Sequence, residues 1–501
     1  MFADFFGYVF LVCNSQNHVG SLQDMLSLLS IQEESSLTLF ISFKTLLMSC
    51  VRRLLRDAWS LAIKTLSQIE LRKVSEHLAL AKATEQLGIS NPDAIRYAYG
   101  LIVETLRQQN LINSFLESII KSKTLDALSL EVQVFLRLYV YQTRALKNWA
   151  DPNLEEAQRI AKLGRTILGW KTLRDVESYL GFLLTKRIEP SLLGTSDEER
   201  IALQTYHPNW FVEYCFKLFG REKAIAFLEG SIYPPPLFVR LNTLMASREQ
   251  IVARLETDGI KLEKAAPLKD VYKVTHAMSP LAKTTSYNEG LFYIQDKASC
   301  FAGEVADPKP EMIVLDVCAA PGAKTTYLAQ LMQNQGIIYS IDYSARRMKS
   351  WKQENSRMGT AIAEPLLADA RCYLPSNIEA DAVVLDPPCT STGVFGRHPS
   401  AKWRLTLKSI EAMAEIQWSM INNVAEKVKS GGFLIYSTCS VTVEENEIII
   451  ERFLKWHQDF RLAEIYPRFG LPGLRGLAKC KRLYPHLHES NGFFIAKLER
   501  Y

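Results

Sequence analysis

Four short apolar segments between residues 312 and 386 constrain the fold of this chain more than any other feature. Each is followed by an acidic residue, and a stretch of helical character separates it from the next. Strands that alternate with helices are typical of βαβ units and a parallel sheet, whose ligands bind at the carboxyl ends of the strands. The segments are residues 312–315, 337–341, 365–368 and 382–385, and the acids that follow them are Asp316, Asp342, Asp369 and Asp386. We therefore expect an α/β domain with four carboxylates at the ligand-binding edge of its sheet.

The loop after the first segment narrows the choice of ligand. It opens a helix with small residues and a single glycine, Gly322. A Walker phosphate loop is excluded, because Val317 stands where its first glycine belongs and Ala323 separates Gly322 from the following lysine. The dinucleotide pattern G-x-G-x-x-G is also absent, so a nucleoside without phosphate is left. A carboxylate can accept hydrogen bonds from ribose hydroxyls or from an adenine amino group, which suits Asp342 and Asp369 and makes S-adenosylmethionine a fitting ligand.

Three strings in this half of the chain resemble the signature motifs of a known family. DVCAAPGAKTT at 316–326, DPPCTSTG at 386–393 and YSTCS at 436–440 look like motifs of the RsmB/Nop/Sun family of RNA cytosine-5 methyltransferases, in the family's order. The resemblance implies a Rossmann-like class I methyltransferase sheet and S-adenosylmethionine as cofactor. One departure is Ala323, where the family often has a second glycine, although a helix start tolerates alanine. The cofactor-binding residues that we predict are Cys318, Ala319, Ala320, Pro321, Gly322, Ala323, Lys324, Asp342, Asp369 and Asp386.

Cys439 is the residue that we expect to carry the chemistry. Methylation of cytosine at carbon 5 requires that a nucleophile first add to carbon 6, and a thiolate can both add and leave again. Cys439 follows an apolar run, residues 433–436, and lies among small polar residues that would expose its sulfur. The family resemblance assigns the attack to this same cysteine, and it assigns product release to the cysteine after Pro-Pro, Cys389. Asp386 is predicted to hydrogen-bond the base, and Lys324 to orient neighbouring groups.

Composition restricts the setting of this chemistry. With 501 residues, 48% of them hydrophobic and 23% charged, the chain can form two or three domains with apolar cores. The net charge of +5 is too small to indicate nucleic-acid binding by itself. Nine cysteines without C-x-x-C spacing argue against a zinc site and a secreted disulfide scaffold, so no metal and a reducing, cytoplasmic setting are expected. No apolar run reaches the roughly 18 residues of a membrane span, and we expect a monomer.

Four regions are predicted along the chain. Residues 1–47 are a leader of uncertain structure, without a signal-peptide pattern or a clean helical period, and a start at Met48 would leave them out. Residues 48–190 have helical spacing and predict an all-α domain, which the resemblance makes NusB-like and RNA-binding. By the same resemblance, residues 191–285 are a small α/β RNA-binding subdomain. Residues 286–501 are the Rossmann-like methyltransferase domain.

Capping and turn residues predict several element ends. Residues 91–93 and 151–153 are expected to open helices, and residues 295–299 to open another that leads into the catalytic sheet. A strand is expected after Pro236, and residues 492–498 are expected to form the last strand. A helix at 247–258 and a strand at 271–275 complete these expectations.

Several polar residues could contact RNA. The resemblance orients Arg240 and Asn242, an R-x-N motif, toward the substrate. The loop at 396–404 borders the expected base pocket and has a stronger claim to RNA than the basic run at 346–352, which we interpret as a solvated helix face. Basic residues of the helical region could contact phosphates, although a solvated face is the commoner explanation; they are Arg165, Arg174, Lys186 and Arg187. Other residues are interpreted as structural: His207 and Trp210 as a packed corner, His486 as a local hydrogen-bonding residue, and Cys300, Cys372 and Cys480 as small apolar residues.

Three alternatives are left open by the sequence. Ribosomal RNA is favoured as the substrate by the helical N-terminal domain, and transfer RNA is possible. An amino-group methyltransferase would need an aromatic residue where Cys389 stands, and Cys439 would then be idle. A noncatalytic RNA-binding scaffold would need neither cysteine, although both are present together with the aspartates.

Overall fold

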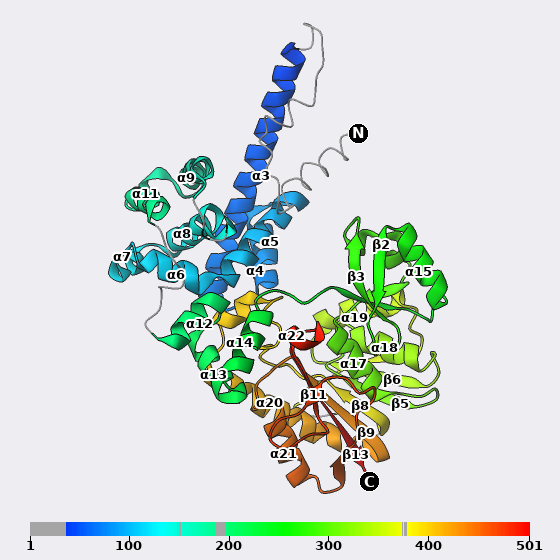
Figure 1. Cartoon of the computed structure of the whole chain (residues 1–501). Helices are drawn as coiled ribbons and strands as arrows, with labels where there is room; N and C mark the ends of the chain where they lie inside the picture. Colours follow the sequence, from blue (N-terminus) through cyan, green and yellow to red (C-terminus); the bar gives the residue numbers. More distant parts are fainter. Residues whose placement is uncertain (1–36, 148, 150–151, 187–195, 373, 375–377) are drawn as a thin grey trace.

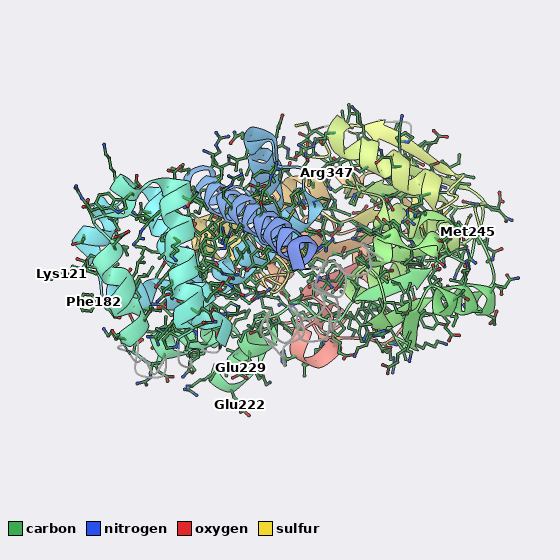
Figure 2. The ribbon with its side chains drawn as sticks, turned by 90° about the horizontal axis from the view of Figure 1, so that it is seen from above. Lys121, Phe182, Glu222, Glu229, Met245 and Arg347 are labelled. Carbon is green, nitrogen blue, oxygen red and sulfur yellow. The ribbon has the colours of Figure 1, made fainter. Side chains whose placement is uncertain are left out.

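The computed structural model describes residues 37–147, 149, 152–186, 196–372, 374 and 378–501. A helical part comes first, a small four-stranded sheet follows, and a nine-stranded sheet covered by helices completes the chain (Figure 1). Lys121 and Phe182 lie at the end of the helical part that is far from Met245 of the small sheet region (Figure 2). None of the helices in the described ranges combines the length and the apolar composition needed to cross a bilayer.

The helical part surrounds α8, whose residues Val134, Phe135 and Leu138 are fully buried. Its helices are α3 (Leu37–Arg72), α4 (Glu76–Leu87), α5 (Pro92–Arg107), α6 (Gln109–Glu117), α7 (Ser122–Ala127), α8 (Leu130–Thr143), η2 (Ala145–Lys147), α9 (Leu154–Leu168), α10 (Trp170–Leu173) and α11 (Glu177–Thr185). The predicted starts at 91–93 and 151–153 are confirmed, because the side chains of Asn91 and Asn153 accept hydrogen bonds from the first turns of α5 and α9.

The predicted start of the first helix was wrong. We expected helical character from about Ser49, but α3 begins at Leu37, inside the predicted leader. Residues 37–50 contain no glycine or proline, so a helix that has formed downstream can continue through them without a cap. The rest of the predicted leader, residues 1–36, lies outside the described residues.

Three helices and a small antiparallel sheet follow. The helices α12 (Asp197–Thr205), α13 (Asn209–Phe219) and α14 (Arg221–Gly230) occupy the first part of the region in which we expected a small α/β subdomain. The sheet has the order β2-β3-β1-β4, and the predicted strand after Pro236, the helix at 247–258 and the strand at 271–275 are confirmed. Its elements are β1 (Phe238–Leu241), α15 (Arg248–Thr257), β2 (Ile260–Lys264), β3 (Val271–Ala277), η4 (Leu281–Lys283), α16 (Thr285–Asn288) and β4 (Phe292–Ile294).

The large sheet has the order β11-β12-β13-β9-β8-β5-β6-β7, with β10 paired to β13. Its central strands β9, β8, β5, β6 and β7 are parallel, which confirms the α/β fold expected from the four apolar segments. Its strands are β5 (Ile313–Val317), β6 (Ile337–Asp342), β7 (Ala363–Leu367), β8 (Ala380–Leu385), β9 (Val428–Thr438), β10 (Phe460–Leu462), β11 (Leu471–Pro472), β12 (Lys481–Leu483) and β13 (Phe493–Arg500). Its helices are α17 (Lys297–Ala306), α18 (Ala323–Leu331), α19 (Ala345–Arg357), η5 (Pro399–Trp403), α20 (Leu407–Ala425), α21 (Glu447–Trp456) and α22 (Pro485–His488).

Alternate residues of the strands face two separate apolar cores. Leu315 and Val383 pack with α20 and α21 on one face of the sheet, whereas Val314 and Val384 pack with α17 and α18 on the other. Burial on both faces explains why the strands read as continuous apolar runs in the sequence. Because the two layers hold the parallel strands in register, the loops at their carboxyl ends are brought to one edge.

Candidate active site

Two cysteine-bearing loops meet at the carboxyl edge of the large sheet. Strand β8 ends at Leu385 and β9 at Thr438, and these strands are parallel neighbours, with Leu385 opposite Tyr436. The loops that follow carry Cys389 and Cys439, whose sulfur atoms lie 3.2 Å apart. Residues 50 positions apart in the sequence are therefore in direct contact at the ligand-binding edge.

The contact between the two sulfurs makes the cysteines chemically unequal. Both side chains are partly exposed. The hydrogen bond from the Cys389 thiol lowers the pKa of Cys439, with a smaller contribution from Ser391, whose Oγ is 3.5 Å away. The same hydrogen bond, together with burial, raises the pKa of Cys389 well above its ordinary value. Cys439 is thus the cysteine that more readily becomes a thiolate, and Cys389 stays protonated beside it.

An ion pair borders the cysteines. Asp386 follows β8 directly, and its Oδ2 atom accepts a hydrogen bond from Nζ of Lys324, in the first turn of α18. Burial alone would favour the neutral amine of Lys324, but the Asp386 carboxylate outweighs this effect and raises the pKa of the lysine. The other carboxylate oxygen, Oδ1, accepts a hydrogen bond from Ser437 Oγ at 3.4 Å, which is a long and therefore weak hydrogen bond. One oxygen of Asp386 is therefore committed to Lys324, and the other is weakly held.

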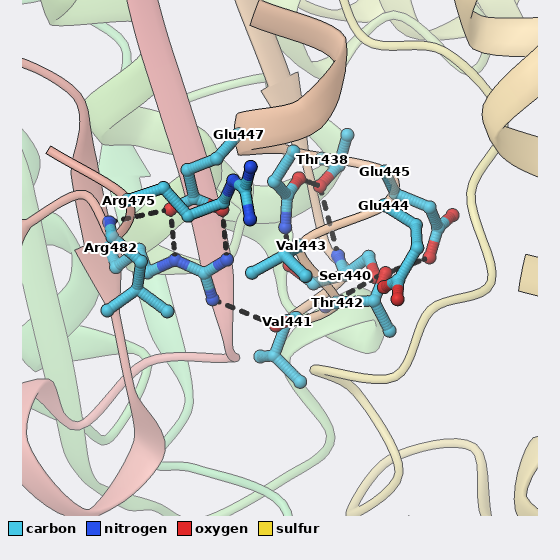
Figure 3. A network of polar contacts seen from close by, with 12 residues as sticks. Thr438, Ser440, Val441, Thr442, Val443, Glu444, Glu445, Glu447, Arg475 and Arg482 are labelled. Carbon is cyan, nitrogen blue, oxygen red and sulfur yellow. Dashed lines mark hydrogen bonds and ion pairs between the residues drawn. The ribbon is translucent and has the colours of Figure 1, made fainter. Parts of the chain in front are cut away.

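The carboxylate of Glu445 accepts hydrogen bonds from both cysteine loops. It is fully buried and accepts hydrogen bonds from the backbone N–H of Thr390, which is 2.8 Å away, and from the Thr390 hydroxyl. Ser440 and Thr442 donate their hydroxyls at 2.5 and 2.8 Å (Figure 3). The Gln417 amide donates at 2.9 Å. Since Thr390 and Ser440 are the residues after Cys389 and Cys439, this carboxylate sets the spacing of the loops.

A second buried acid, Glu447, binds the arginine that contacts the Cys439 loop. Glu447 receives two hydrogen bonds from the guanidinium of Arg482, from Nε at 2.6 Å and from Nη2 at 2.5 Å, and both residues are buried (Figure 3). The remaining Nη1 of Arg482 donates to the Val441 carbonyl at 2.8 Å. Arg482 therefore links β12 to the chain two residues after Cys439. We did not predict Glu445 or Glu447 from the sequence. The acidic run at 444–447, shortly after the cysteine motif, is the signal that could have pointed to them.

The predicted cofactor loop makes a tight turn between β5 and α18. The N–H of Gly322 donates to the Ala319 carbonyl at 2.8 Å, and the N–H of Ala319 donates to the Ile341 carbonyl of β6 at 2.9 Å. Gly322 has a φ of 112°, and a Cβ there would lie 3.0 Å from Asn355 Nδ2. Only glycine fits this backbone and this space. Burial raises the pKa of Cys318, which opens the turn, to about 12, so its thiol stays protonated near neutral pH.

Asp342 and Asp369 lie at the ends of neighbouring strands but differ in their surroundings. The Asp342 side chain is fully buried, its Oδ1 accepts the Ser344 N–H at 3.0 Å, and its Oδ2 accepts no hydrogen bond within the described residues. Arg347 Nη1 lies 3.0 Å from Oδ2, in a position that contributes charge without the geometry of a hydrogen bond. Asp369 is bound by the guanidinium of Arg371, which lowers the pKa of the carboxyl. Asp342 thus has one buried carboxylate oxygen that is paired with the charge of Arg347 and makes no hydrogen bond within the described residues.

Comparison with known proteins identifies the family. A family model described as 16S rRNA methyltransferase RsmB/F matches residues 304–499, and the ferredoxin-like domain of RsmF/B-like methyltransferases matches residues 207–279. The crystal structure of PH0851 has a TM-score of 0.74 and is 30% identical, covering 89% of this chain and 99% of that one. The chain belongs to the RsmB/Nop/Sun family of RNA cytosine-5 methyltransferases.

Two curated relatives differ in how much of this methyltransferase they match. The probable ribosomal RNA small subunit methyltransferase B of Bacillus subtilis is 28% identical over 88% of this chain and 98% of its own length. The tRNA (cytosine(72)-C(5))-methyltransferase of Pyrococcus horikoshii is 37% identical over 44% of this chain and 55% of its own length. The first match therefore takes in most of the helical part, and the second covers less than half of the chain.

The R-x-N motif of the methyltransferase does not face a substrate, contrary to our expectation. Arg240 is fully buried, and its guanidinium donates to Gln295, Gln330 and Thr326. Asn242 is also buried, and its amide donates to the carbonyls of Gly290 and Met358. Every polar group of the motif thus joins β1 to α18 or to neighbouring loops, which leaves nothing to bind RNA.

The loop at 396–404 packs against the helical part instead of forming an open RNA surface. Trp403 Nε1 donates to the Leu106 carbonyl at 2.7 Å, and Lys402, which is fully buried, donates to the Tyr206 carbonyl at 2.9 Å. Arg107 reaches back from α5 to the Gly396 carbonyl at 2.8 Å. Trp403 therefore contacts the helical part and Lys402 the end of α12, so both residues of the loop that follows β8 have partners within the protein.

The structure also places the other histidines, cysteines and basic residues on which the sequence led to an expectation. His207 and Trp210 pack with Phe211 as a corner, as expected. His486 packs against Tyr484 and makes no hydrogen bond within the described residues, although we expected a local hydrogen-bonding residue; His488 Nδ1 accepts the Tyr484 N–H at 3.0 Å instead. Cys300 and Cys480 are buried as expected, but Cys372 is exposed. In the helical part, Arg165, Arg174 and Lys186 contact Glu177, Asp175 and the Ser118 carbonyl, and Arg187 lies outside the described residues.

Proposed function

We propose that this methyltransferase forms 5-methylcytosine in ribosomal RNA, with S-adenosylmethionine as the methyl donor and Cys439 as the covalent nucleophile. The observation that carries the proposal is the 3.2 Å contact between Cys439 and Cys389 at the carboxyl edge of the sheet. An amino-group methyltransferase has no use for a thiol pair in this position. A noncatalytic scaffold has no use for a cysteine whose pKa is lowered by its neighbour.

Cys439 supplies the first step. Its thiolate adds to carbon 6 of cytosine, a bond that moves electron density to carbon 5, the atom to be methylated. The target base must leave its stack to reach the sulfur, which requires a single-stranded or flipped-out cytidine. Asp386 Oδ1, which is only weakly held by Ser437, can accept a hydrogen bond from the exocyclic amino group of the base. Lys324 keeps the partner oxygen of Asp386 fixed, so the carboxylate cannot turn away.

The predicted cofactor residues fit S-adenosylmethionine. The buried Oδ2 of Asp342, without a hydrogen bond of its own, is suited to a ribose hydroxyl. The turn at Gly322 packs closely against Asn355 and Trp351 of α19, and the start of α18, whose backbone N–H groups can face a ligand, follows it directly. When bound, S-adenosylmethionine supplies an electrophilic methyl group. Asp369, whose carboxylate also accepts hydrogen bonds from Arg371, is proposed to accept a hydrogen bond from the adenine amino group.

Cys389 completes the cycle by handling a proton. In the free enzyme its pKa is raised first by the hydrogen bond to Cys439 and then by burial. Once the sulfur of Cys439 is bonded to carbon 6, it carries no negative charge, so this hydrogen bond and its effect disappear. The pKa of Cys389 then falls, so its own proton can pass to solvent, and the thiolate that is left can accept the carbon 5 proton. Loss of that proton restores the double bond as the Cys439 sulfur leaves.

Ribosomal RNA is proposed as the substrate because of the helical part. The relative that matches 88% of the chain is a probable ribosomal RNA small subunit enzyme, whereas the transfer RNA enzyme matches 44%. We also propose that the helical part is NusB-like and binds RNA, as the sequence suggested. Bisulfite sequencing of ribosomal and transfer RNA from cells with and without the gene distinguishes the two substrates. A 5-methylcytosine lost only from transfer RNA would contradict the proposed target.

The chemistry is tested with purified protein and labelled S-adenosylmethionine. We expect Cys439→Ser to reduce methyl transfer by about 10³-fold or more, as for other nucleophile replacements. Cys50→Ser is the matched control, because this cysteine is exposed and lies on α3, far from the two cysteine loops in sequence. Unchanged transfer by Cys439→Ser would contradict the covalent mechanism, and label on the exocyclic nitrogen would favour an amino-group methyltransferase.

A further inference from the structure

A cluster of potential metal ligands lies where the helical part meets the catalytic loop. Glu76 and His77 form the first turn of α4, and His398 stands just before η5. One donor atom from each of the three side chains can be chosen so that all lie within 4.8 Å of one another. Glu76 and His398 are 322 residues apart in the sequence, so only the tertiary fold brings these groups together.

The carboxylate of the cluster is buried and hydrogen-bonded. Glu76 is fully buried, and the Nδ1 atom of His398 lies 3.0 Å from its Oε1. Its Oε2 accepts the hydroxyl of Ser400. A buried carboxylate that is held by two hydrogen bonds thus lies beside two imidazoles.

The imidazoles are accessible and already oriented. His77 is exposed and His398 partly so, which leaves a path for an ion from solvent. Their rings are edge-to-face, with centroids 5.7 Å apart. His77 Nε2 lies 3.2 Å from the Tyr99 hydroxyl, so the other ring nitrogen, Nδ1, is the one left for an ion. A ligating histidine usually has such a partner on its second nitrogen, and a ligating carboxylate is usually hydrogen-bonded as Glu76 is by Ser400.

We propose that Glu76, His77 and His398 bind a divalent transition-metal ion and thereby join the helical part to the loop that begins at Cys389. Two imidazoles and a carboxylate are a donor set of Zn²⁺ sites, and water completes the coordination of such three-residue sites. We expected no metal from the sequence, because its cysteines lack the spacing of a zinc site. That test could not detect this cluster, since no short motif contains its three residues. The proposal is independent of the proposed function, since binding is measured without RNA and without methyl transfer.

The competing explanation is a metal-free hydrogen bond between Glu76 and His398. His77 distinguishes the two, because it takes no part in that hydrogen bond but is required for the metal site. Replacement of His77 leaves the Glu76 contacts with His398 and Ser400 in place. The variant His77→Ala is therefore expected to keep the fold and to lose only the ion.

Titration calorimetry of the chelator-treated full chain with ZnCl₂ tests the site. We expect one Zn²⁺ bound by the wild type and a loss of affinity of at least about 100-fold in His77→Ala and in His398→Ala, since removal of an outer partner alone costs 10–100-fold. His276→Ala is the matched control, because His276 is exposed on β3, away from the cluster, and we expect it to bind Zn²⁺ as the wild type does.

The cysteines require a second measurement, because thiolates also bind zinc. Co²⁺ in place of Zn²⁺ should give an absorption spectrum of nitrogen and oxygen ligation that is lost in His77→Ala. A spectrum with strong sulfur-to-cobalt charge transfer, or equal Zn²⁺ binding by wild type, His77→Ala and His398→Ala, would overturn the proposal. Absence of Zn²⁺ binding by the wild type would overturn it as well and leave the Glu76–His398 hydrogen bond as a metal-free contact.

Discussion

Replacement of Glu445 by glutamine should uncouple the two cysteine loops. The Oε1 atom of Glu445 accepts the Thr390 N–H and the Gln417 amide, and its Oε2 atom accepts three hydroxyls, those of Thr390, Ser440 and Thr442. In Glu445→Gln the amide oxygen can keep the first two bonds. The amide nitrogen would face the three hydroxyls, of which at most two can turn and accept its hydrogens.

The cost of this change can be worked from the number and kind of bonds. A hydrogen bond to a charged group contributes about 1.5–3 kcal/mol and a neutral one about 0.5–1.5 kcal/mol. Four of the five bonds to Glu445 lose their charge, and the fifth is lost. Added as independent bonds, these losses come to about 5–9 kcal/mol, which is an upper bound because the five bonds share one carboxylate. We take about 3 kcal/mol as the conservative expectation, which corresponds to about a 100-fold change in a local opening equilibrium.

Amide hydrogen exchange measures that opening directly. Peptides that cover residues 389–393 and 438–446 should exchange about 100-fold faster in Glu445→Gln than in the wild type, and methyl transfer should fall in parallel. Glu444→Gln is the matched control, because Glu444 is the neighbouring acid and contacts the Tyr214 hydroxyl outside this network. Equal exchange in the two variants would refute the conclusion that Glu445 holds the cysteine loops together.

Three further predictions concern the cysteine pair, the cofactor and pH. Cys389→Ser should accumulate a protein–RNA adduct that survives denaturing electrophoresis, because the proton acceptor for product release is gone; a wild-type rate of release would contradict its role. Asp342→Asn should weaken S-adenosylmethionine binding in calorimetry by about 10- to 100-fold, equivalent to a charged hydrogen bond of about 1.5–3 kcal/mol, and unchanged affinity would remove Asp342 from the site. Burial raises the pKa of Asp316 from 3.8 to about 6, so the stability linked to its protonation is full below about pH 4 and is lost as the pH rises through 6. Denaturant unfolding should show the wild type losing about 2–3 kcal/mol over this range, whereas Asp316→Asn should lack this component; parallel curves would contradict it.

The sheet and its two cysteine loops could be predicted because their signals are local. An apolar run that ends in an aspartate marks the carboxyl end of a parallel strand, and this holds for Asp342 and Asp386. Cys439 follows such a run as well, so its place at the same edge followed from the sequence. Asp316 is the exception, because β5 extends one residue beyond it and buries the carboxylate within the strand.

The wrong predictions assumed that charged residues are exposed to solvent. Arg240 and Lys402 are basic residues in apparent loops or strand ends, yet both are buried, and their partners come from segments far away in sequence. Glu445 looks like one of several acids in a polar loop, and only the fold shows that two loops donate to it. No local pattern predicts that Glu76 meets His398, because their contact depends on how the helical part packs on the catalytic sheet.

The attack by Cys439 is tested most directly by locating the covalent bond to RNA. A substrate RNA with 5-fluorocytidine at the target position traps the adduct, because the fluorine cannot leave as a proton does. After proteolysis and nuclease treatment, mass spectrometry should find the modified nucleoside on the peptide that contains Cys439, in the wild type and in Cys389→Ser. An adduct on Cys389, or no adduct at all with an enzyme that still methylates unmodified RNA, would contradict the mechanism.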